Sequence, residues 1–126
     1  MAISACGVDR TYPRVNTKLF NTIASGSHGA LVTEYPPETP PQRHRFLTRN
    51  RLVAALTEGT VVVEAAWGSG AVNAVHRAEG FGKTTMGVPR PITTVGSLGC
   101  HELVKDGRAH LVTSAEDVSE LLGGIG

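Results

Sequence analysis

The sequence has few cysteines, no long apolar run and almost no net charge, and each shortage excludes a class of protein. Its two cysteines, Cys6 and Cys100, lie in no Cys-x-x-Cys or Cys/His spacing. We therefore expect buried or incidental thiols, with no metal site and no disulfide. No apolar stretch approaches the roughly 20 residues of a membrane helix, and no signal-peptide pattern opens the chain. We expect a single cytoplasmic domain over residues 1–126.

The charge is distributed unevenly along the chain. The net charge of +1 argues by itself against a strongly basic nucleic-acid-binding protein. However, residues 1–51 hold seven Lys/Arg and three Asp/Glu, a balance of +4, whereas residues 52–126 hold five and eight, a balance of −3. Arg43, Arg45, Arg49 and Arg51 concentrate the positive charge, with no acid nearby. A solvated basic loop is the plain alternative, but Phe46 and the adjacent helix start favour a phosphate-binding face.

Strand and helix patterns alternate along the chain. Helices are predicted over 16–27, 48–56, 71–79, 98–105 and 115–122, and strands over 2–6, 30–33, 60–65, 84–88 and 109–112. Thr48 and Ser114 are expected to cap their helices, and Gly26 to end the first. The unbroken β-branched run from Thr60 predicts a central strand covered on both faces. This alternation predicts an α/β domain with a mostly parallel sheet.

Three loops follow predicted strands, where ligands bind in parallel sheets: residues 34–46, 66–70 and 89–96. The middle loop is the best phosphate candidate. Gly68 and Gly70 are expected to allow close backbone approach or positive φ, and Ser69 to cap the next helix, whose N–H groups would face an anion. A tight turn with glycines for steric reasons is an equally good reading of the loop alone.

Glu64 stands out because an acid at the end of an apolar central strand is costly to bury unpaired. Either it reaches solvent at the strand end, or it pairs with a nearby base such as Arg51. We expect a supporting ion pair that orients the basic helix, not a catalytic carboxylate. No Ser-His-Asp or Cys-His set can be assembled, and the partial matches to nucleotide-binding and zinc motifs fail, so no enzyme is expected.

An ordered set of short motifs resembles the second half of the DNA-processing protein A family (DprA, also called Smf). The matching pieces are, in order, Gly7-Val8-Asp9, Tyr12-Pro13, Asn16, Thr33-Glu34-Tyr35-Pro36, Phe46, Arg49-Asn50-Arg51, Val63-Glu64-Ala65, Ser69-Gly70 and Val88-Pro89. The resemblance covers essentially the whole chain. It implies a Rossmann-like three-layer sandwich, truncated at the N-terminus relative to the family.

The resemblance also implies a function. Family members bind single-stranded DNA without strong sequence preference, dimerise, and pass the strand to RecA in natural transformation. Carried onto this chain, the family's binding residues fall on Phe46, Arg49, Asn50, Arg51, Ser69 and Gly70. Together with Arg43, Arg45 and Gly68 from the charge and loop patterns, these are the expected DNA-binding and phosphate-binding residues. No cofactor is implied. Single-stranded DNA is the expected partner, with RecA as a further one, and we expect a homodimer or a partner that supplies the missing half.

This sequence departs from the family pattern at several positions. Asn73 stands where threonine is usual, Arg90 where a glycine follows proline, and His101 where asparagine is common. Two alternatives therefore stay open. The chain could be a nucleotide-binding or phosphoribohydrolase-like Rossmann protein that uses Glu64 and residues 68–70, although the Pro-Gly-Gly signature of those enzymes is missing, or it could be an inactive truncated remnant.

Overall fold

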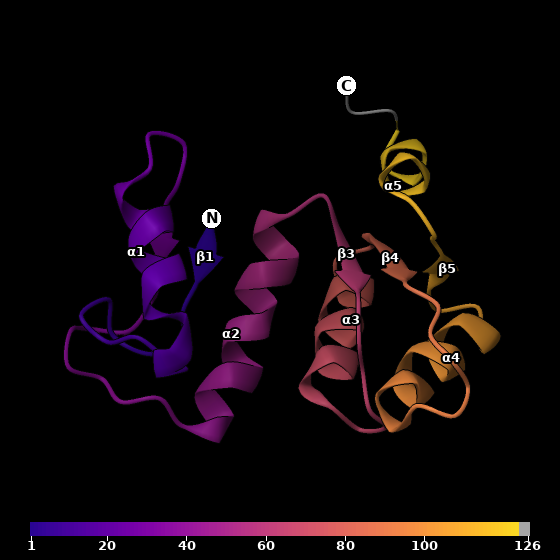
Figure 1. The fold of residues 1–126 in the computed structure, drawn as a ribbon, viewed down its shortest axis with the longest axis horizontal. Helices are drawn as coiled ribbons and strands as arrows, with labels where there is room; N and C mark the ends of the chain where they lie inside the picture. The colour runs from indigo at the N-terminus through magenta and orange to yellow at the C-terminus, as the bar shows by residue number, and fades with distance from the viewer. Residues whose placement is uncertain (124–126) are drawn as a thin grey trace. The chain divides into compact units, whose positions relative to one another are not determined.

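The computed structural model describes residues 1–123 and divides the chain into two compact units (Figure 1). The first unit is Met1–Leu52, and the second begins at Val53. The boundary between the units lies one residue from position 51, where the sequence changes from a net positive to a net negative charge. The excess of positive charge therefore belongs to the first unit. That the whole chain forms a single domain stays a prediction.

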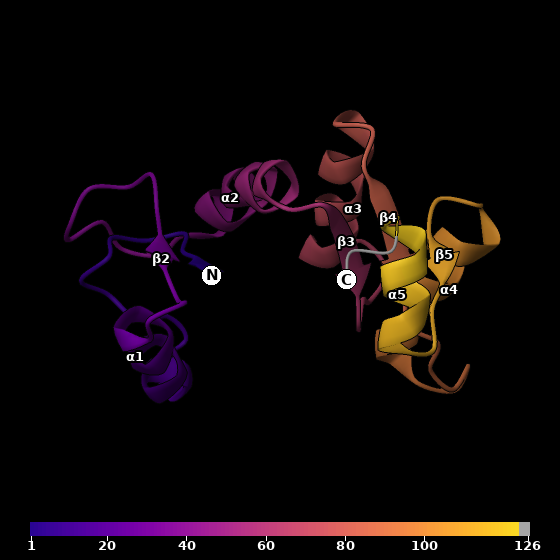
Figure 2. The same ribbon diagram turned by 90° about the horizontal axis from the view of Figure 1, so that it is seen from above.

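The N-terminal unit is built on two short parallel strands joined by a helix. Strand β1 (Ala2–Ile3) pairs with β2 (Leu31–Val32), with Ala2 opposite Leu31. A 3-10 turn, η1 (Arg14–Asn16), leads into helix α1 (Thr17–Ser25), which packs beside β2 (Figure 2). Gly26 is the C-cap of α1, as predicted. Both strands are shorter than predicted, and the buried residues Ser4, Ala5 and Cys6 form a loop after β1.

Helix α2 (Arg43–Leu56) begins five residues before the predicted start at Thr48. The prediction that Thr48 caps this helix is wrong: its hydroxyl donates to the carbonyl oxygen of His44 at 2.9 Å, the bond of a residue inside a helix. The helix begins directly after Pro40, Pro41 and Gln42, because proline cannot continue a helix from within but is tolerated before its first turn. The basic residues therefore lie on the helix itself.

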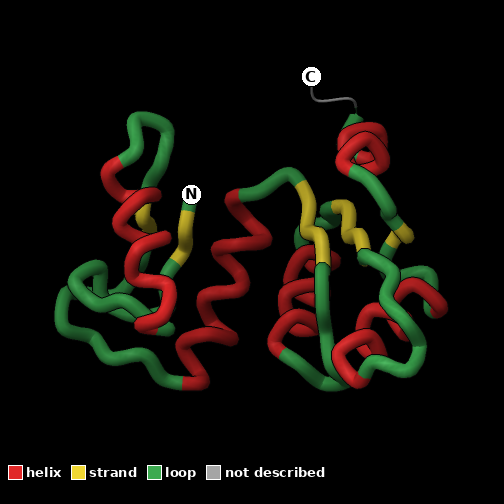
Figure 3. Tube along the Cα trace, in the orientation of Figure 1, coloured by secondary structure: helices red, strands yellow, loops and turns green. Residues whose placement is uncertain are grey.

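The C-terminal unit holds a parallel three-stranded sheet in the order β3-β4-β5. Its elements are β3 (Gly59–Val62), α3 (Gly70–Gly80), β4 (Thr84–Gly87), η2 (Val95–Ser97), α4 (Leu98–Lys105), β5 (His110–Leu111) and α5 (Ala115–Leu121). Figure 3 shows the regular alternation of short strands and longer helices. The predicted α/β class with parallel strands is confirmed.

Strand β3 is not the central strand that its sequence predicted. It ends at Val62, and β4 occupies the centre of this sheet. Val61, the residue of β3 that faces away from the core residue Val62, is 37% exposed, so β3 is not covered on both faces. A β-branched run predicts a strand, but its place in the sheet depends on which other segments pair with it.

The core of the C-terminal unit lies between the sheet and helices α3 and α4, which pack side by side (Figure 1). It is formed by Val62, Ala65, Val75, Cys100, Leu103 and Ala109. On the other side of the sheet, Val61 and Val112 line a hollow with Val118 of α5. The hydroxyl of Ser114 caps α5 by accepting from the Asp117 N–H at 3.1 Å, as predicted. This gives the unit a helix, sheet, helix layering.

Candidate nucleic-acid interface

The predicted basic residues occupy the first turns of α2 in the N-terminal unit. Arg43 is exposed, and among residues 1–123 its guanidinium has no hydrogen bond or ion pair. Arg45 is half-buried, lies 5.7 Å from the centroid of the Tyr35 ring, and donates to the carbonyl oxygen of Pro40. The bond and the ring fix the position of Arg45 but leave other guanidinium N–H groups to contact a phosphate.

Phe46 forms the centre of an aromatic cluster beside these arginines. Its ring lies 5.4 Å from the ring of Tyr12, with an interplanar angle of 49°. The Arg49 guanidinium lies 5.7 Å from the Phe46 centroid. Aromatic rings flanked by arginines are what sequence-tolerant binding of single strands requires, because every base offers a face for stacking. The sequence predicted Phe46 in this role but did not assign one to Tyr12 or Tyr35.

Arg49 is held by the protein more firmly than the sequence suggested. It donates to the carbonyl oxygen of Ile3 at 2.6 Å and, through Nε, to Oδ1 of the buried Asn50 at 3.3 Å. Burial lowers the pKa of the Arg49 guanidinium from its ordinary value. These contacts hold α2 against the end of β1. Arg49 and Asn50 therefore help to fix the position of Phe46, and Arg49 also adds a positive charge beside its ring.

Arg51 pairs with an acid that the sequence did not place nearby. Its Nη2 lies 2.5 Å from Oε2 of Glu34. Arg51, which was offered as one possible partner of Glu64, is paired with Glu34 instead, and the expectation that no acid lies near the basic cluster is wrong. Glu34 follows β2, and the fold of the N-terminal unit brings this loop to α2, a contact that sequence spacing does not reveal.

The glycine turn lies in the C-terminal unit, between β3 and α3. Gly68 has φ of +69°, a conformation that favours glycine. Gly70 is the first residue of α3, has no positive φ, and would tolerate a Cβ with nothing within 4 Å. Ser69 is the N-cap residue, but its hydroxyl makes no capping bond and is buried without a partner among the described residues. The steric requirement therefore falls on Gly68, not on Gly70.

Glu64 follows the end of β3 and reaches solvent. Its side chain is 56% exposed, and its Oε2 lies 3.6 Å from Nη1 of Arg90, its partner in place of the expected Arg51. Its carboxylate also packs over Gly96, where an added Cβ would collide with Oε1. The Ala65 N–H donates to the Gly96 carbonyl at 2.9 Å, so the second and third predicted loops meet at one edge of the sheet.

Two buried polar atoms at this edge lack hydrogen-bond partners within residues 1–123. They are the Ser69 hydroxyl and the Nε of Arg90, which follow the neighbouring strands β3 and β4. A buried donor without a partner costs about 1–3 kcal/mol. Arg90 was noted in the sequence only as a departure from the family pattern. The signal available in the sequence was an arginine that follows Val88-Pro89, directly after a predicted strand.

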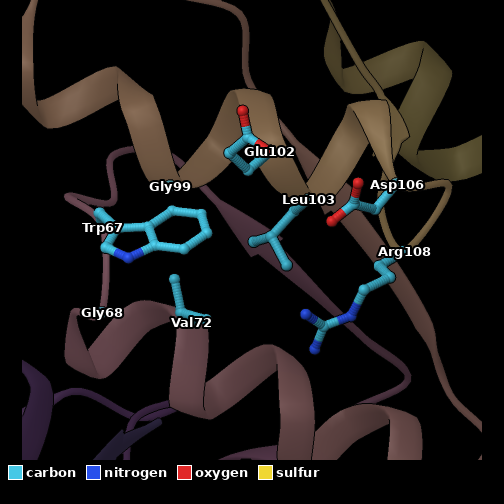
Figure 4. Close-up of a pocket in the computed structure, with 8 residues that line it drawn as sticks. All are labelled: Trp67, Gly68, Val72, Gly99, Glu102, Leu103, Asp106 and Arg108. Carbon is cyan, nitrogen blue, oxygen red and sulfur yellow. The ribbon is translucent and has the colours of Figure 1, made fainter.

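A cavity beside the glycine turn lies between α3 and α4 and has a volume of about 260 Å³. Figure 4 shows the indole of Trp67 at one end and the guanidinium of Arg108 at the other, with Leu103 between them. Glu102 and Asp106 also line it, and Arg108 is already bonded to both carboxylate oxygens of Glu79, at 2.8 and 2.9 Å. This cavity does not suit an anionic ligand, because its remaining charges are carboxylates.

Both cysteines are buried, as the sequence analysis expected. Cys6 and Cys100 are free and buried, and burial raises the pKa of both thiols. Within residues 1–123 no group of His, Cys, Asp or Glu side chains could hold a metal ion. In the same part of the chain, no helix has the length and apolar character needed to cross a membrane.

The predicted site residues thus form two groups. Arg43, Arg45, Phe46, Arg49, Asn50 and Arg51 share α2 in the N-terminal unit, whereas Glu64, Gly68, Ser69 and Gly70 belong to the C-terminal unit. That both groups contact one ligand stays a prediction. The sequence analysis gave no role to Tyr12, Tyr35 and Arg90, which the structure places against Phe46, Arg45 and Glu64, although the two tyrosines lie next to prolines in the motifs that it used.

Comparison with known proteins supplies the wider context. A DprA homologue from Mycobacterium tuberculosis is 49% identical over 126 residues, which are 100% of this chain and 32% of that protein. The X-ray structure of DNA processing protein A from Streptococcus pneumoniae matches 94% of this chain and 41% of its own, with 35% identity and a TM-score of 0.85. The chain therefore spans about a third to two fifths of these relatives.

A second solved structure is that of DNA processing protein A from Helicobacter pylori, reported for its single-stranded DNA binding mode. It matches 95% of this chain and 54% of its own, with 28% identity and a TM-score of 0.83. These matches agree with the expected Rossmann-like fold. The model of the DNA recombination-mediator protein A family matches residues 1–123. This chain belongs to that family.

Proposed function

We propose that this chain binds single-stranded DNA without strong sequence preference, as part of a protein of the DprA type. One observation carries the proposal: on α2 the Arg49 guanidinium lies over the Phe46 ring, which packs against Tyr12, and the Arg45 guanidinium lies over the Tyr35 ring, while Arg43 is exposed. Arginines supply phosphate contacts, and an aromatic face supplies stacking that every base can use.

The glycine turn provides a second set of phosphate contacts in this proposal. Ser69 precedes α3, whose N-terminus favours an anion, and the buried Ser69 hydroxyl and Arg90 Nε have no partner among the described residues. A phosphate group bound there would accept from both. Glu64 positions Arg90 by its ion pair and does no chemistry.

The biological role that we propose follows from family membership. The protein would take part in DNA uptake by natural transformation, with RecA receiving the bound strand, and it would act in the cytoplasm as a binding protein, not as an enzyme. It would work as a homodimer or with a partner that supplies the part of the relatives outside this chain. Its exposed apolar side chains support association: Val15 and Leu19 are 87% and 57% exposed.

Fluorescence anisotropy with labelled oligonucleotides tests the proposal. We expect oligo(dT), oligo(dA) and a mixed-sequence strand to bind with similar affinity and more tightly than duplex DNA of equal length. Trp67 is the only tryptophan, so its fluorescence reports separately on the glycine turn. A change on DNA binding would support contact there. No binding to any strand would overturn the proposal, and release of adenine from AMP would favour the phosphoribohydrolase alternative.

A further inference from the structure

A separate cavity in the N-terminal unit lies beside the aromatic cluster. It has a volume of about 550 Å³ and is lined by Asp9, Arg10, Thr11, Tyr12, Arg14, Thr17 and Pro41. None of these residues was among the predicted site residues. The volume is within the range of about 300–1,000 Å³ that is typical of small-ligand sites. The lining is mainly polar, with two arginines and one carboxylate.

Tyr12 connects this cavity to the predicted interface. It lines the cavity, its ring lies 5.4 Å from that of Phe46, and its side chain is 51% exposed. The interplanar angle of 49° means that the two rings do not stack face to face. If one base stacked on Tyr12 and the next on Phe46, the two bases would not be parallel to each other. Proteins hold single strands in this way, with each base stacked on an aromatic side chain instead of on its neighbour.

The charge of the cavity favours a phosphate. Arg10 donates through Nε to the Glu38 carbonyl at 3.1 Å, and its terminal nitrogens make no ion pair within residues 1–123. In the same residues the Arg14 guanidinium has neither a hydrogen bond nor an ion pair. Asp9 is the one acid in the lining, and its Oδ1 already accepts from the Glu38 N–H at 2.8 Å. Two cations thus face the cavity with donors to spare.

We propose that this cavity is an additional nucleotide subsite, in which one base stacks on Tyr12 and the adjoining phosphate is contacted by Arg10 and Arg14. This inference rests on the proposed binding of single-stranded DNA and extends it beyond Phe46 by one nucleotide. The ligand is a nucleotide within a strand, recognised by its phosphate and the face of its base. No sequence preference arises, because no base edge is read.

The test compares oligo(dT) strands of increasing length in anisotropy titrations over a range of salt. We expect Arg14→Ala to weaken binding of longer strands roughly three- to tenfold and to lower the salt slope by about 0.7, the value for one lost phosphate contact. The shortest strand that binds should be unaffected. Tyr12→Ala should weaken strands of every length, because Tyr12 also packs against Phe46, but should weaken the longer strands by a larger factor. Tyr12→Phe should restore binding because it keeps the ring.

Lys18→Ala is the matched control, because Lys18 is exposed in the same unit, carries one positive charge, and does not line the cavity. Circular dichroism establishes that each variant is folded. If Arg14→Ala behaves like Lys18→Ala, or if Tyr12→Ala weakens strands of all lengths equally, the subsite is wrong while DNA binding stands. If the parent chain binds no strand of any length, both the proposed function and the subsite are wrong.

Discussion

The Arg51 guanidinium lies 2.5 Å from the Glu34 carboxylate, so the fold places an acid directly against the basic cluster of α2. The two side chains are 47% and 32% exposed, and such a pair contributes little to stability, about 0–1 kcal/mol. Its larger effect is on charge. Glu34 cancels part of the positive potential that Arg51 would otherwise offer to a phosphate.

Replacing Glu34 with Gln is therefore expected to tighten binding of single strands by about two- to fivefold at low salt, for all sequences alike. The gain should shrink as salt is added, because the effect is electrostatic. Anisotropy titrations measure both. Glu116→Gln, an equal change of charge on α5, serves as the control. An unchanged affinity for Glu34→Gln would show that no phosphate approaches Arg51.

Arg43 and Arg49 should differ in what their loss does. Arg43→Ala should weaken DNA binding and lower the salt slope by about 0.7, with unfolding in urea unchanged, because its guanidinium is exposed and has no partner in the described residues. Arg49→Ala should also cost about 1–3 kcal/mol of stability, since it leaves the Ile3 carbonyl without its donor. Equal stability of the two variants would contradict the positioning role of Arg49.

Gly68 should tolerate valine much less well than Gly70 does. Gly68→Val places a β-branched residue at φ of +69° and should cost about 1–2 kcal/mol. Gly70→Val enters the first turn of α3 with nothing within 4 Å of its Cβ, so we expect a change below about 1 kcal/mol. Urea unfolding measures both. If Gly70→Val also leaves DNA affinity unchanged, Gly70 makes no close contact with the strand.

Acid should weaken the C-terminal unit through Glu79. The hydrogen bonds from Arg108 hold the pKa of the Glu79 carboxyl below its ordinary value of 4.5. A depressed folded pKa stabilises the protein above the unfolded pKa, and this contribution is lost as the pH falls through the folded value. Unfolding free energies measured from about pH 6 to pH 3 should fall less steeply for Glu79→Gln than for the parent.

Asp117 leaves part of that acid dependence in the Glu79 variant, because hydrogen bonds from Thr113 also lower the pKa of its carboxyl. At neutral pH the Glu79→Gln change should cost at most about 1 kcal/mol, since both partners are partly exposed. Parallel pH profiles for parent and variant would show that the Arg108 bond does not persist in solution.

The isolated chain is expected to associate. The apolar side chains of Val15 and Leu19 are exposed, and α1 has no buried residue. Sedimentation at increasing concentration should show a dimer or larger species. Leu19→Ser should shift the distribution towards monomer if α1 is the contact. A compact monomer of the parent at high concentration would contradict this prediction.

Local sequence patterns were enough to predict the kinds of element and most of their positions. Helix α4 and the Ser114 cap lie where the pattern predicted them, because capping residues and apolar spacing act over a few neighbouring positions. The start of α2 was missed because the prediction took Thr48 as the N-cap. The arginines and the leucine before Thr48 form helices as readily as the residues after it, so propensity did not mark the true start. The basic segment and Phe46 could be predicted as a binding site because they are neighbours in the sequence.

Which distant residues meet could be seen only in the folded chain. The structure brings together segments that are far apart in the sequence and share no motif. The pairs are Arg51 with Glu34, Arg90 with Glu64, and Tyr12 with Phe46. The central place of β4 likewise depends on pairing with both of its neighbours. Such contacts are selected by the packing of the whole unit, since a side chain's charge or ring predicts what it can bind but not which partner the fold brings within reach.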